Sequence, residues 1–305
     1  MIYTLTLNPA IDRTYLVDGV VIDGVNRICG IRDECGGKGI NVARALTRSG
    51  VPAKAVALLG GINGRQLAAG IRAEGIDLVA QEIGSNTRVN HVFSVDGDRS
   101  IKFNEPGPTL TSDDISQLFR LVESVQKDQG VWVLSGSLPQ GVSNSIYRHL
   151  IETIHGYGSK VFLDTNGMAL QEGLAGLPDW IKPNYEEAMA LFPDELSPTG
   201  LCEKLIQQGA ANVLLSKGAD GMLFSSRYEA VHIQVPELPV KNPVAAGDAA
   251  VAGFLYGFTQ QMNPIDCAKW AAAFGTAAAA SHTNCFQSMP EVKSFFEQIK
   301  VDAVL

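Results

Sequence analysis

The chain has 305 residues, of which 46% are hydrophobic and 18% are charged, and its formal net charge is −8 at pH 7. This is the composition of a globular protein with a large core, and the negative charge argues against a general nucleic-acid-binding surface. No apolar run reaches the roughly 18 residues of a membrane-spanning helix, and the N-terminus does not resemble a signal peptide. We therefore expect a cytoplasmic protein that binds neither nucleic acid nor membranes.

The cysteines and histidines show none of the common catalytic or zinc-binding spacings. The five cysteines form no CxxC pair, so each is expected to be a reduced, packed thiol. No histidine belongs to an HExxH motif, and a Gly-x-Ser-x-Gly elbow is absent. Zinc enzymes and serine hydrolases therefore lose their usual sequence support.

The N-terminal part of the chain begins with an apolar strand, which we expect at residues 1–7. Residues 10–33 then alternate apolar and polar side chains, which predicts strands with one solvated face. Residues 36–46 form a glycine-rich turn that leads into an amphipathic helix, although a GxxxxGK[ST] P-loop is absent. The glycines allow the backbone to approach a ligand closely, with Lys38 and Asn41 on the first helical turn.

A small second sheet is predicted from the next segment. Strands at 54–59 and 78–83 flank a helix at 66–73, which is a βαβ pattern. Residues 87–95 then alternate with period two, turn at 96–98 and return at 99–104 as a β-hairpin. We expect this hairpin to pair with the earlier polar strands outside the main core, as a lid that excludes water from a cleft.

Beyond residue 108, helices and strands alternate regularly. Strands are expected at 131–134, 161–164, 180–182 and 213–216, and the helices between them at 111–128, 143–157, 169–174, 185–191 and 201–209. This order predicts a parallel sheet with helices on both faces and a ligand site at the carboxyl ends of the strands. A hairpin at 222–235, two helices after Asp248 and a last helix from Pro290 complete the chain.

The segment 241–254 begins as a loop containing Pro243 and continues as a helix, so Gly247 and Asp248 lie at a helix N-terminus. Free N–H groups and the helix dipole favour an anion such as phosphate there. Asp248 is then either an acid that complements the dipole or a general base beside a phosphoryl group. The small neighbours of Asp248 leave the backbone open to a ligand, which a simple cap does not require.

Three further features have two interpretations each. Glu187 follows Asn184 by three residues, so it either completes a helix cap or orders water around Mg²⁺. Residues 216–221 form either an ordinary tight turn or a loop whose N–H groups face a nucleotide. The basic residues Arg27, Lys38 and Arg88 are either solvated charges or a converging site for a substrate phosphate.

Taken together, five motifs resemble those of the ribokinase-like (PfkB) sugar kinases over essentially the full chain. They lie at residues 6–12, at 36–42, at 135–139, at 182–184 with Glu187, and at 242–248. The opening residues 6–9 and the glycine-rich residues 36–39 look like the branch of 1-phosphofructokinase and tagatose-6-phosphate kinase. All five motifs in this order make the resemblance specific.

The resemblance implies an α/β fold with a mostly parallel central sheet, helices on both faces and a small β-sheet lid. The nucleotide-binding core would comprise residues 1–9, 34–84 and 106–305, and the lid residues 10–33 and 85–105. The implied activity is ATP- and Mg²⁺-dependent phosphorylation of a ketohexose phosphate, with fructose 1-phosphate favoured over tagatose 6-phosphate. A homodimer through the lid is also implied as possible.

The resemblance also implies a role for each site residue. Asp248 would be the base, beside the N–H groups of Ala245, Ala246 and Gly247. The sugar hydroxyls would be held by Asp12, Gly37 and Asn41, and the existing phosphate by Arg27, Lys38, Arg88 and Asn90. The residues expected along ATP are Lys182, Asn184, Ser216, Gly218 and Gly221, with Asn284 at the base and Glu187 at Mg²⁺ through water.

One position departs from the family pattern, because Ala245 stands where the family usually has glycine. If that position requires a positive φ, alanine costs on the order of 1 kcal/mol and displaces an N–H group of the anion site. This departure keeps open a sugar-phosphate sensor with weak catalysis. A kinase of an unphosphorylated sugar or nucleoside is the second alternative.

Overall fold

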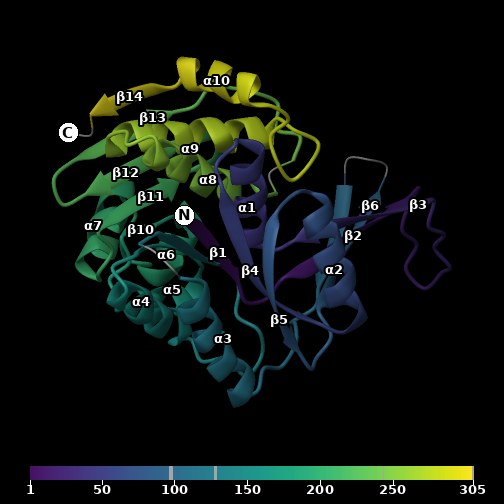
Figure 1. Ribbon diagram of the computed structural model, residues 1–305. Coiled ribbons are helices and arrows are strands. Elements are labelled where there is room, and N and C mark those ends of the chain that lie inside the picture. Colours follow the sequence, from purple (N-terminus) through teal and green to yellow (C-terminus); the bar gives the residue numbers. More distant parts are fainter. Residues whose placement is uncertain (96–98, 127–128, 243, 304–305) are drawn as a thin grey trace.

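The computed structural model describes residues 1–95, 99–126, 129–242 and 244–303. Its core is a ten-stranded sheet in the order β14-β13-β12-β11-β10-β9-β8-β1-β4-β5 (Figure 1). The neighbouring strands from β5 to β11 in this order run parallel to one another. Each of β12, β13 and β14 runs antiparallel to the strand before it in the chain-ordered series β11, β12, β13 and β14. In chain order the strands are β1 Ile2–Thr6, β4 Ala53–Gly60, β5 Asp77–Ile83, β8 Val131–Ser135, β9 Lys160–Asp164, β10 Trp180–Ile181, β11 Asn212–Ser216, β12 Met222–Ser226, β13 Ala230–Gln234 and β14 Lys300–Ala303.

Helices cover both faces of this sheet, as the alternation of apolar strands and helices predicts. One layer contains α1 Lys38–Arg48, α2 Gly61–Ala73, α8 Ala246–Thr259, α9 Pro264–Ala279 and α10 Met289–Gln298. The opposite layer contains α3 Ser112–Val125, α4 Ile146–Gly156, α5 Gly167–Leu174, α6 Tyr185–Leu191 and α7 Pro198–Gln207.

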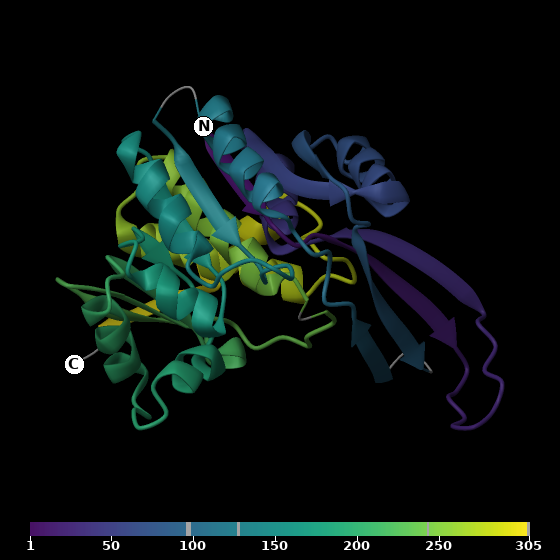
Figure 2. The same cartoon turned by 90° about the horizontal axis from the view of Figure 1, so that it is seen from below.

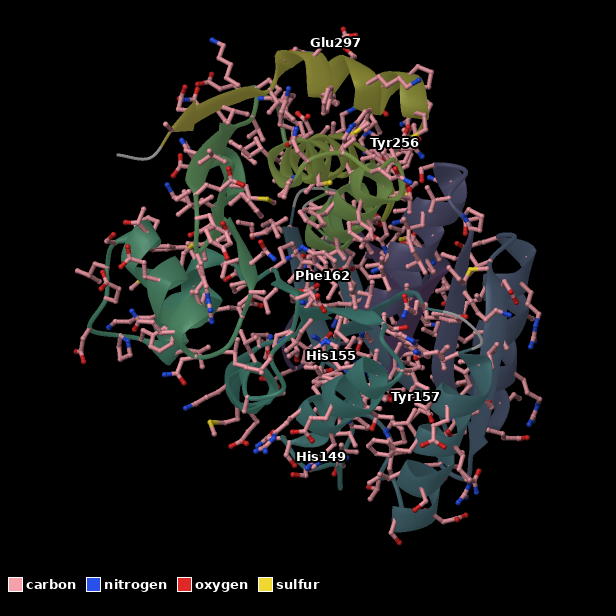
Figure 3. All side chains as sticks on the ribbon, turned by 60° about the vertical axis from the view of Figure 1, so that its left-hand side comes forward. His149, His155, Tyr157, Phe162, Tyr256 and Glu297 are labelled. Atoms are coloured by element: carbon pink, nitrogen blue, oxygen red, sulfur yellow. The ribbon has the colours of Figure 1, made fainter. Side chains whose placement is uncertain are left out.

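The central strands are apolar on both faces, which explains why two separate cores form. On β8, Val133 packs into the cluster beneath α8 and α9, whereas Trp132 and Leu134 pack beneath α4. Successive strand residues point to opposite faces, so one apolar run supplies both cores. Figure 3 shows the fully buried Phe162 of β9 in the interior and the exposed His149 of α4 at the periphery.

A second, four-stranded sheet has the order β3-β2-β6-β7 and is the small separate sheet that we expected, which we call the lid. Its strands are β2 Ala10–Val17, β3 Gly30–Gly36, β6 Arg88–Val95 and β7 Arg99–Asn104. In Figure 2 these purple and blue strands project away from the body of the molecule. Strand β3 continues to Gly36, beyond the expected lid boundary at residue 33. The turn expected at 96–98 lies outside the described residues.

Several element boundaries differ from the sequence prediction. Helix α2 begins at Gly61 rather than at residue 66, because Asn86 of a distant segment accepts a hydrogen bond from the N–H of Asn63 at 3.2 Å. Helix α4 begins at Ile146 rather than at 143, where the hydroxyl of Ser143 instead accepts from the backbone N–H of Ser145.

The last strand, β14, was not predicted at all. It has four residues and pairs only with β13, so its partner rather than its sequence defines it. Helix α3 ends at Val125, and the predicted end of this helix, residue 128, lies outside the described residues together with Pro243. Among the helices of the described ranges, none combines the length and apolarity needed to cross a membrane.

Candidate functional site

A cavity of about 1390 Å³ lies at the carboxyl ends of the parallel strands, between the core and the lid. The core contributes Lys38, Asn41 and Asp248 to its walls, and the lid contributes Asp12 and Arg88. Pockets for a single small ligand usually have about 300–1000 Å³. The cavity is therefore large enough for two ligands bound side by side.

Helix α8 begins at the wall of this cavity, as the sequence predicts. Its N-cap residue Ala245 has φ 63° and ψ 2°, in the left-handed region that an alanine adopts only with strain. The first-turn residues Ala246, Gly247 and Asp248 line the cavity, where their N–H groups lack intrahelical acceptors. A Cβ atom at Gly247 would lie 3.0 Å from Nζ of Lys182. The helix terminus and the Lys182 ammonium group thus face the same space.

Asp248 is 6% exposed, and Nδ2 of Asn41 donates a hydrogen bond to its Oδ2 at 2.8 Å. Burial raises the pKa of Asp248 to about 6, although the positive charge of Lys38 and the bond from Asn41 act in the opposite direction. The carboxylate is therefore ionised at neutral pH and binds a proton more tightly than an exposed aspartate. These properties suit a general base better than a simple helix cap.

Two lysines share one buried carboxylate next to this acid. Nζ of Lys38 and Nζ of Lys182 lie 3.3 and 3.6 Å from Oδ1 of Asp164, whose side chain is fully buried at the end of β9. Burial alone would lower the pKa of Lys38, but Asp164, Asp248 and Glu187 together raise it. Lys38 therefore stays protonated, which suits it for binding an anion. Asp164 was not among the expected site residues, although its position at the carboxyl end of a parallel strand was a signal for it.

The lid wall of the cavity carries polar atoms that the protein itself leaves without partners. The guanidinium Nη atoms of Arg88 donate to the carbonyl oxygens of Asn8 and Glu105, both at 3.0 Å. Its buried Nε finds no acceptor among the described residues, and the buried amide oxygen Oδ1 of Asn90 finds no donor there. Nδ2 of Asn90 donates to Oδ1 of Asp12 at 2.8 Å, while burial raises the pKa of Asp12. Buried orphaned polar atoms of this kind indicate a ligand.

The opposite end of the cavity is formed by the turn after β11. Gly218 and Gly221 have φ values of 60° and 82°, and a Cβ atom at Gly221 would lie 2.1 Å from the carbonyl oxygen of Ile233. Gly221 therefore requires glycine, and the left-handed backbone at Gly218 favours it. All five residues expected along ATP line this cavity, namely Lys182, Asn184, Ser216, Gly218 and Gly221.

Glu187 takes part in the helix cap that the sequence suggested. The N–H of Glu187 donates to Oδ1 of Asn184 at 2.7 Å, and the N–H of Asn184 donates to Oε2 of Glu187 at 2.9 Å. The second carboxylate oxygen, Oε1, lies 3.5 Å from Nδ2 of Asn166, at the cavity wall. The capping interpretation is thus confirmed, and Glu187 also lines the cavity.

Two of the expected site residues do not line the cavity. Arg27 lies in the exposed loop between β2 and β3, at the outer end of the lid. Asn284 accepts a hydrogen bond from Asn242 and donates one to Oε2 of Glu34, both at 3.0 Å. Asn284 therefore connects the lid strand β3 with the loop before α8, and its contact with a nucleotide base stays a prediction.

The site combines an acid that can accept a hydroxyl proton with N–H and ammonium groups that can hold a phosphoryl group, which is the equipment of a phosphotransferase. A family profile described as pfkB family carbohydrate kinase matches residues 5–291. The chain belongs to this family, and it is a phosphotransferase that acts on a sugar hydroxyl.

The comparisons with individual proteins agree with this assignment. The chain is 34% identical over 304 residues to a 1-phosphofructokinase of Bacillus subtilis, a match that covers 96% of this chain and 99% of that protein. It is similar to the crystal structure of phosphofructokinase-2 from Escherichia coli in complex with fructose-6-phosphate, with 28% identity, a TM-score of 0.89 and coverage of 97% and 98%. Ribokinase from Thermotoga maritima, 17% identical with a TM-score of 0.81 and coverage of 97% and 99%, shares the fold.

We expect Ala245→Gly to raise the free energy of unfolding by about 0.5–1 kcal/mol, because glycine adopts φ 63° without strain. Urea denaturation measures this change. Ala246→Gly is the matched control, since Ala246 begins the helix and glycine there should lower stability. A loss of stability in Ala245→Gly as well would contradict strain at the N-cap.

Proposed function

We propose that the protein is a 1-phosphofructokinase, which converts fructose 1-phosphate and ATP into fructose 1,6-bisphosphate and ADP. The observation that carries this proposal is the placement of Lys38 and Arg88 in one cavity with Asp248. A sugar with a phosphate at one end and a primary hydroxyl at the other can bridge such groups. The name of the Bacillus subtilis relative supports the same substrate.

The chain's own residues account for the steps of the transfer. Asp248 accepts the proton of the sugar hydroxyl as its oxygen bonds to the γ-phosphorus, and the bond from that phosphorus to the β-bridging oxygen breaks to release ADP. The first-turn N–H groups of α8 and the ammonium group of Lys182 stabilise the charge on the transferred group. The lid then excludes water, which limits hydrolysis of ATP.

We further propose that Glu187 would help to hold Mg²⁺, through a water molecule, when the nucleotide is bound. Oε2 of Glu187 is held by the cap, and Oε1 accepts a hydrogen bond of 3.5 Å from Nδ2 of Asn166 at the cavity wall. Each carboxylate oxygen can accept more than one hydrogen bond, so Oε1 could also hold a metal-bound water. No group of three or more His, Cys, Asp or Glu ligands occurs in the described ranges. This fits Mg²⁺, which keeps several waters and takes few protein carboxylates. The metal would supply charge neutralisation at the phosphates.

A cytoplasmic location belongs to the same proposal. Both proposed substrates are highly charged, and such molecules do not cross a membrane unaided. Cell fractionation tests it, and recovery of the protein only outside the cytoplasm would contradict it.

The substrate is tested by measuring ADP release with fructose 1-phosphate, tagatose 6-phosphate, fructose 6-phosphate, fructose and ribose. We expect the highest kcat/KM with fructose 1-phosphate. We also expect Arg88→Ala to raise KM for that substrate at least tenfold, because the guanidinium group would hold its phosphate.

Arg13→Ala is the control for this test, since Arg13 lies on the same lid but pairs with Asp33 at 2.7 Å outside the cavity. A higher kcat/KM with fructose or ribose would indicate a kinase of unphosphorylated sugars. Binding of sugar phosphates without turnover would instead indicate a sensor.

The base assignment predicts both a mutant and a pH effect. Asp248→Asn should lower kcat at least a hundredfold. The kcat/KM of the unchanged enzyme should fall as pH drops below about 6, where Asp248 becomes protonated.

The same acid predicts an effect on stability. Folding raises the pKa of Asp248 from 3.8 to about 6, so the contribution of Asp248 to the free energy of unfolding declines as pH rises to about 6. The Asn variant should therefore be at least as stable at pH 8, as urea denaturation can show. Near-normal turnover of this variant would remove Asp248 from the role.

We also propose that two copies of the chain associate through the outer face of the lid. One cross-strand row on this face consists of Ile31, Tyr15, Phe93 and Ile101. Ile31 is 61% exposed and Ile101 is 40% exposed, an apolar surface that a second copy could cover. One solved relative, phosphofructokinase-2 of Escherichia coli, is described as a tetrameric inhibited form.

We expect the unchanged protein to form dimers and Ile101→Lys to form monomers, because a charge would then lie inside the interface. Light scattering coupled to size-exclusion chromatography measures the mass. Ile62→Lys, which changes an exposed isoleucine on α2, is the matched control and should leave the mass unchanged. A monomeric unchanged protein would contradict the proposal.

A further inference from the structure

Arg44 is a buried cation behind the site. It lies on α1, one turn after Asn41, and is only 8% exposed. Its guanidinium group donates to both carboxylate oxygens of Glu74, to the carbonyl oxygen of Cys35 at 2.6 Å and to Oδ1 of Asn41. Arg44 and Glu74 are both absent from the cavity wall, so neither touches a ligand there.

The bond to Asn41 decides which way its side-chain amide points. A guanidinium group donates hydrogen bonds but cannot accept them, so only the oxygen of the amide can face Arg44. The NH₂ group must then point the other way, where it donates to Oδ2 of Asp248 at 2.8 Å. If the amide were flipped, its NH₂ group would face the N–H donors of Arg44, and its oxygen would face the carboxylate oxygen of Asp248.

Glu74 and Cys35 hold the guanidinium group from two other elements. Glu74 directly follows α2, and Cys35 lies on β3 near the junction of lid and core. A bidentate carboxylate fixes both the position and the plane of a guanidinium group. The unbroken series of contacts therefore runs from Glu74 through Arg44 and Asn41 to Asp248.

We propose that Arg44, held by Glu74, is a positioning residue that acts through the Asn41 amide to keep the carboxylate of Asp248 in its reactive orientation. The inference rests on the proposed function, in which Asp248 is the general base. Groups that support a reacting side chain from behind commonly change activity about 10–100-fold when they are removed.

A purely structural role for Arg44 makes a different prediction, because it would change stability alone. The two roles are separated by the acid limb of the pH profile, which is the fall of kcat/KM at low pH. This fall reports the protonation of Asp248 in the free enzyme. The charged groups that face Asp248 are Lys38 on α1, Asp164 at the end of β9 and Lys182 after β10. Arg44 donates to Glu74, Asn41 and Cys35 rather than to any of these three groups, so changing Arg44 removes no bond of theirs.

The experiment compares Arg44→Met, Arg44→Lys, Asn41→Ala and the double variant Asn41→Ala with Arg44→Met. Each is assayed for ADP release with fructose 1-phosphate across pH, and each is unfolded in urea. We expect Arg44→Met to lower kcat about tenfold or more and to move the acid limb upward by about half a pH unit, because Asp248 loses a donor that favours its charged form. Arg44→Lys keeps the positive charge but loses the planar guanidinium group, so it should show the same changes to a smaller degree. It replaces Arg44→Met in the test if that variant does not fold.

The double variant tests the route through Asn41. If Arg44 acts through that amide, adding Arg44→Met to Asn41→Ala should lower kcat less than twofold further. The effects of substitutions at residues in contact with one another are not additive. Arg48→Met is the matched control, because Arg48 lies on the same helix and donates to the carbonyl oxygen of Phe286 at 2.6 Å. It should lower stability and leave the acid limb unchanged.

An acid limb that stays in place in both Arg44 variants while stability falls would overturn the inference. Full multiplication of the two losses in the double variant would also overturn it. Failure of the proposed base is recognised separately, by near-normal turnover of Asp248→Asn. An inactive Asp248→Asn together with unshifted Arg44 variants would therefore disprove the positioning role alone.

Discussion

The site depends on one carboxylate that is buried at a helix N-terminus. Burial disfavours the charge of Asp248, whereas Lys38, Lys182 and the amide of Asn41 favour it, and the balance puts the pKa at about 6. A fully solvated acid would be too weak a base, and an unpaired buried one would stay protonated at neutral pH. The packing of α1 against α8 creates this balance, because α1 supplies Lys38 and Asn41.

The charges around Asp248 also form a connected set. Asp164 holds Lys38 and Lys182 from beneath, so the two ammonium groups stay close together although they repel each other. Like charges are kept together in this way where a polyanionic ligand is expected to bind between them. The lid adds Arg88 and Asn90 from the other side, so that residues from two sheets enclose one cavity.

Ala245 shows that local strain persists where the surrounding structure demands it. The chain must turn in the left-handed region to direct the N–H groups of α8 into the cavity, and the packed body of α8 against α9 holds that turn. Most of the family motif is retained around a residue that fits it poorly. The cost, about 1 kcal/mol, is small beside the free energy of burying the whole helix.

The sequence by itself determined the α/β class, the small second sheet and most of the residues that line the cavity. Apolar runs, glycines and helix caps act over a few residues, so residues such as Gly221, Asn184 and Asp248 could be interpreted from their neighbours. Only the tertiary structure decided that Asp164 lies beneath two lysines and that Glu74 holds the guanidinium group of Arg44. It also decided that Asn284 contacts Glu34 and that β14 exists. Each of these results depends on partners far apart in the chain, and a local pattern carries no information about such distances.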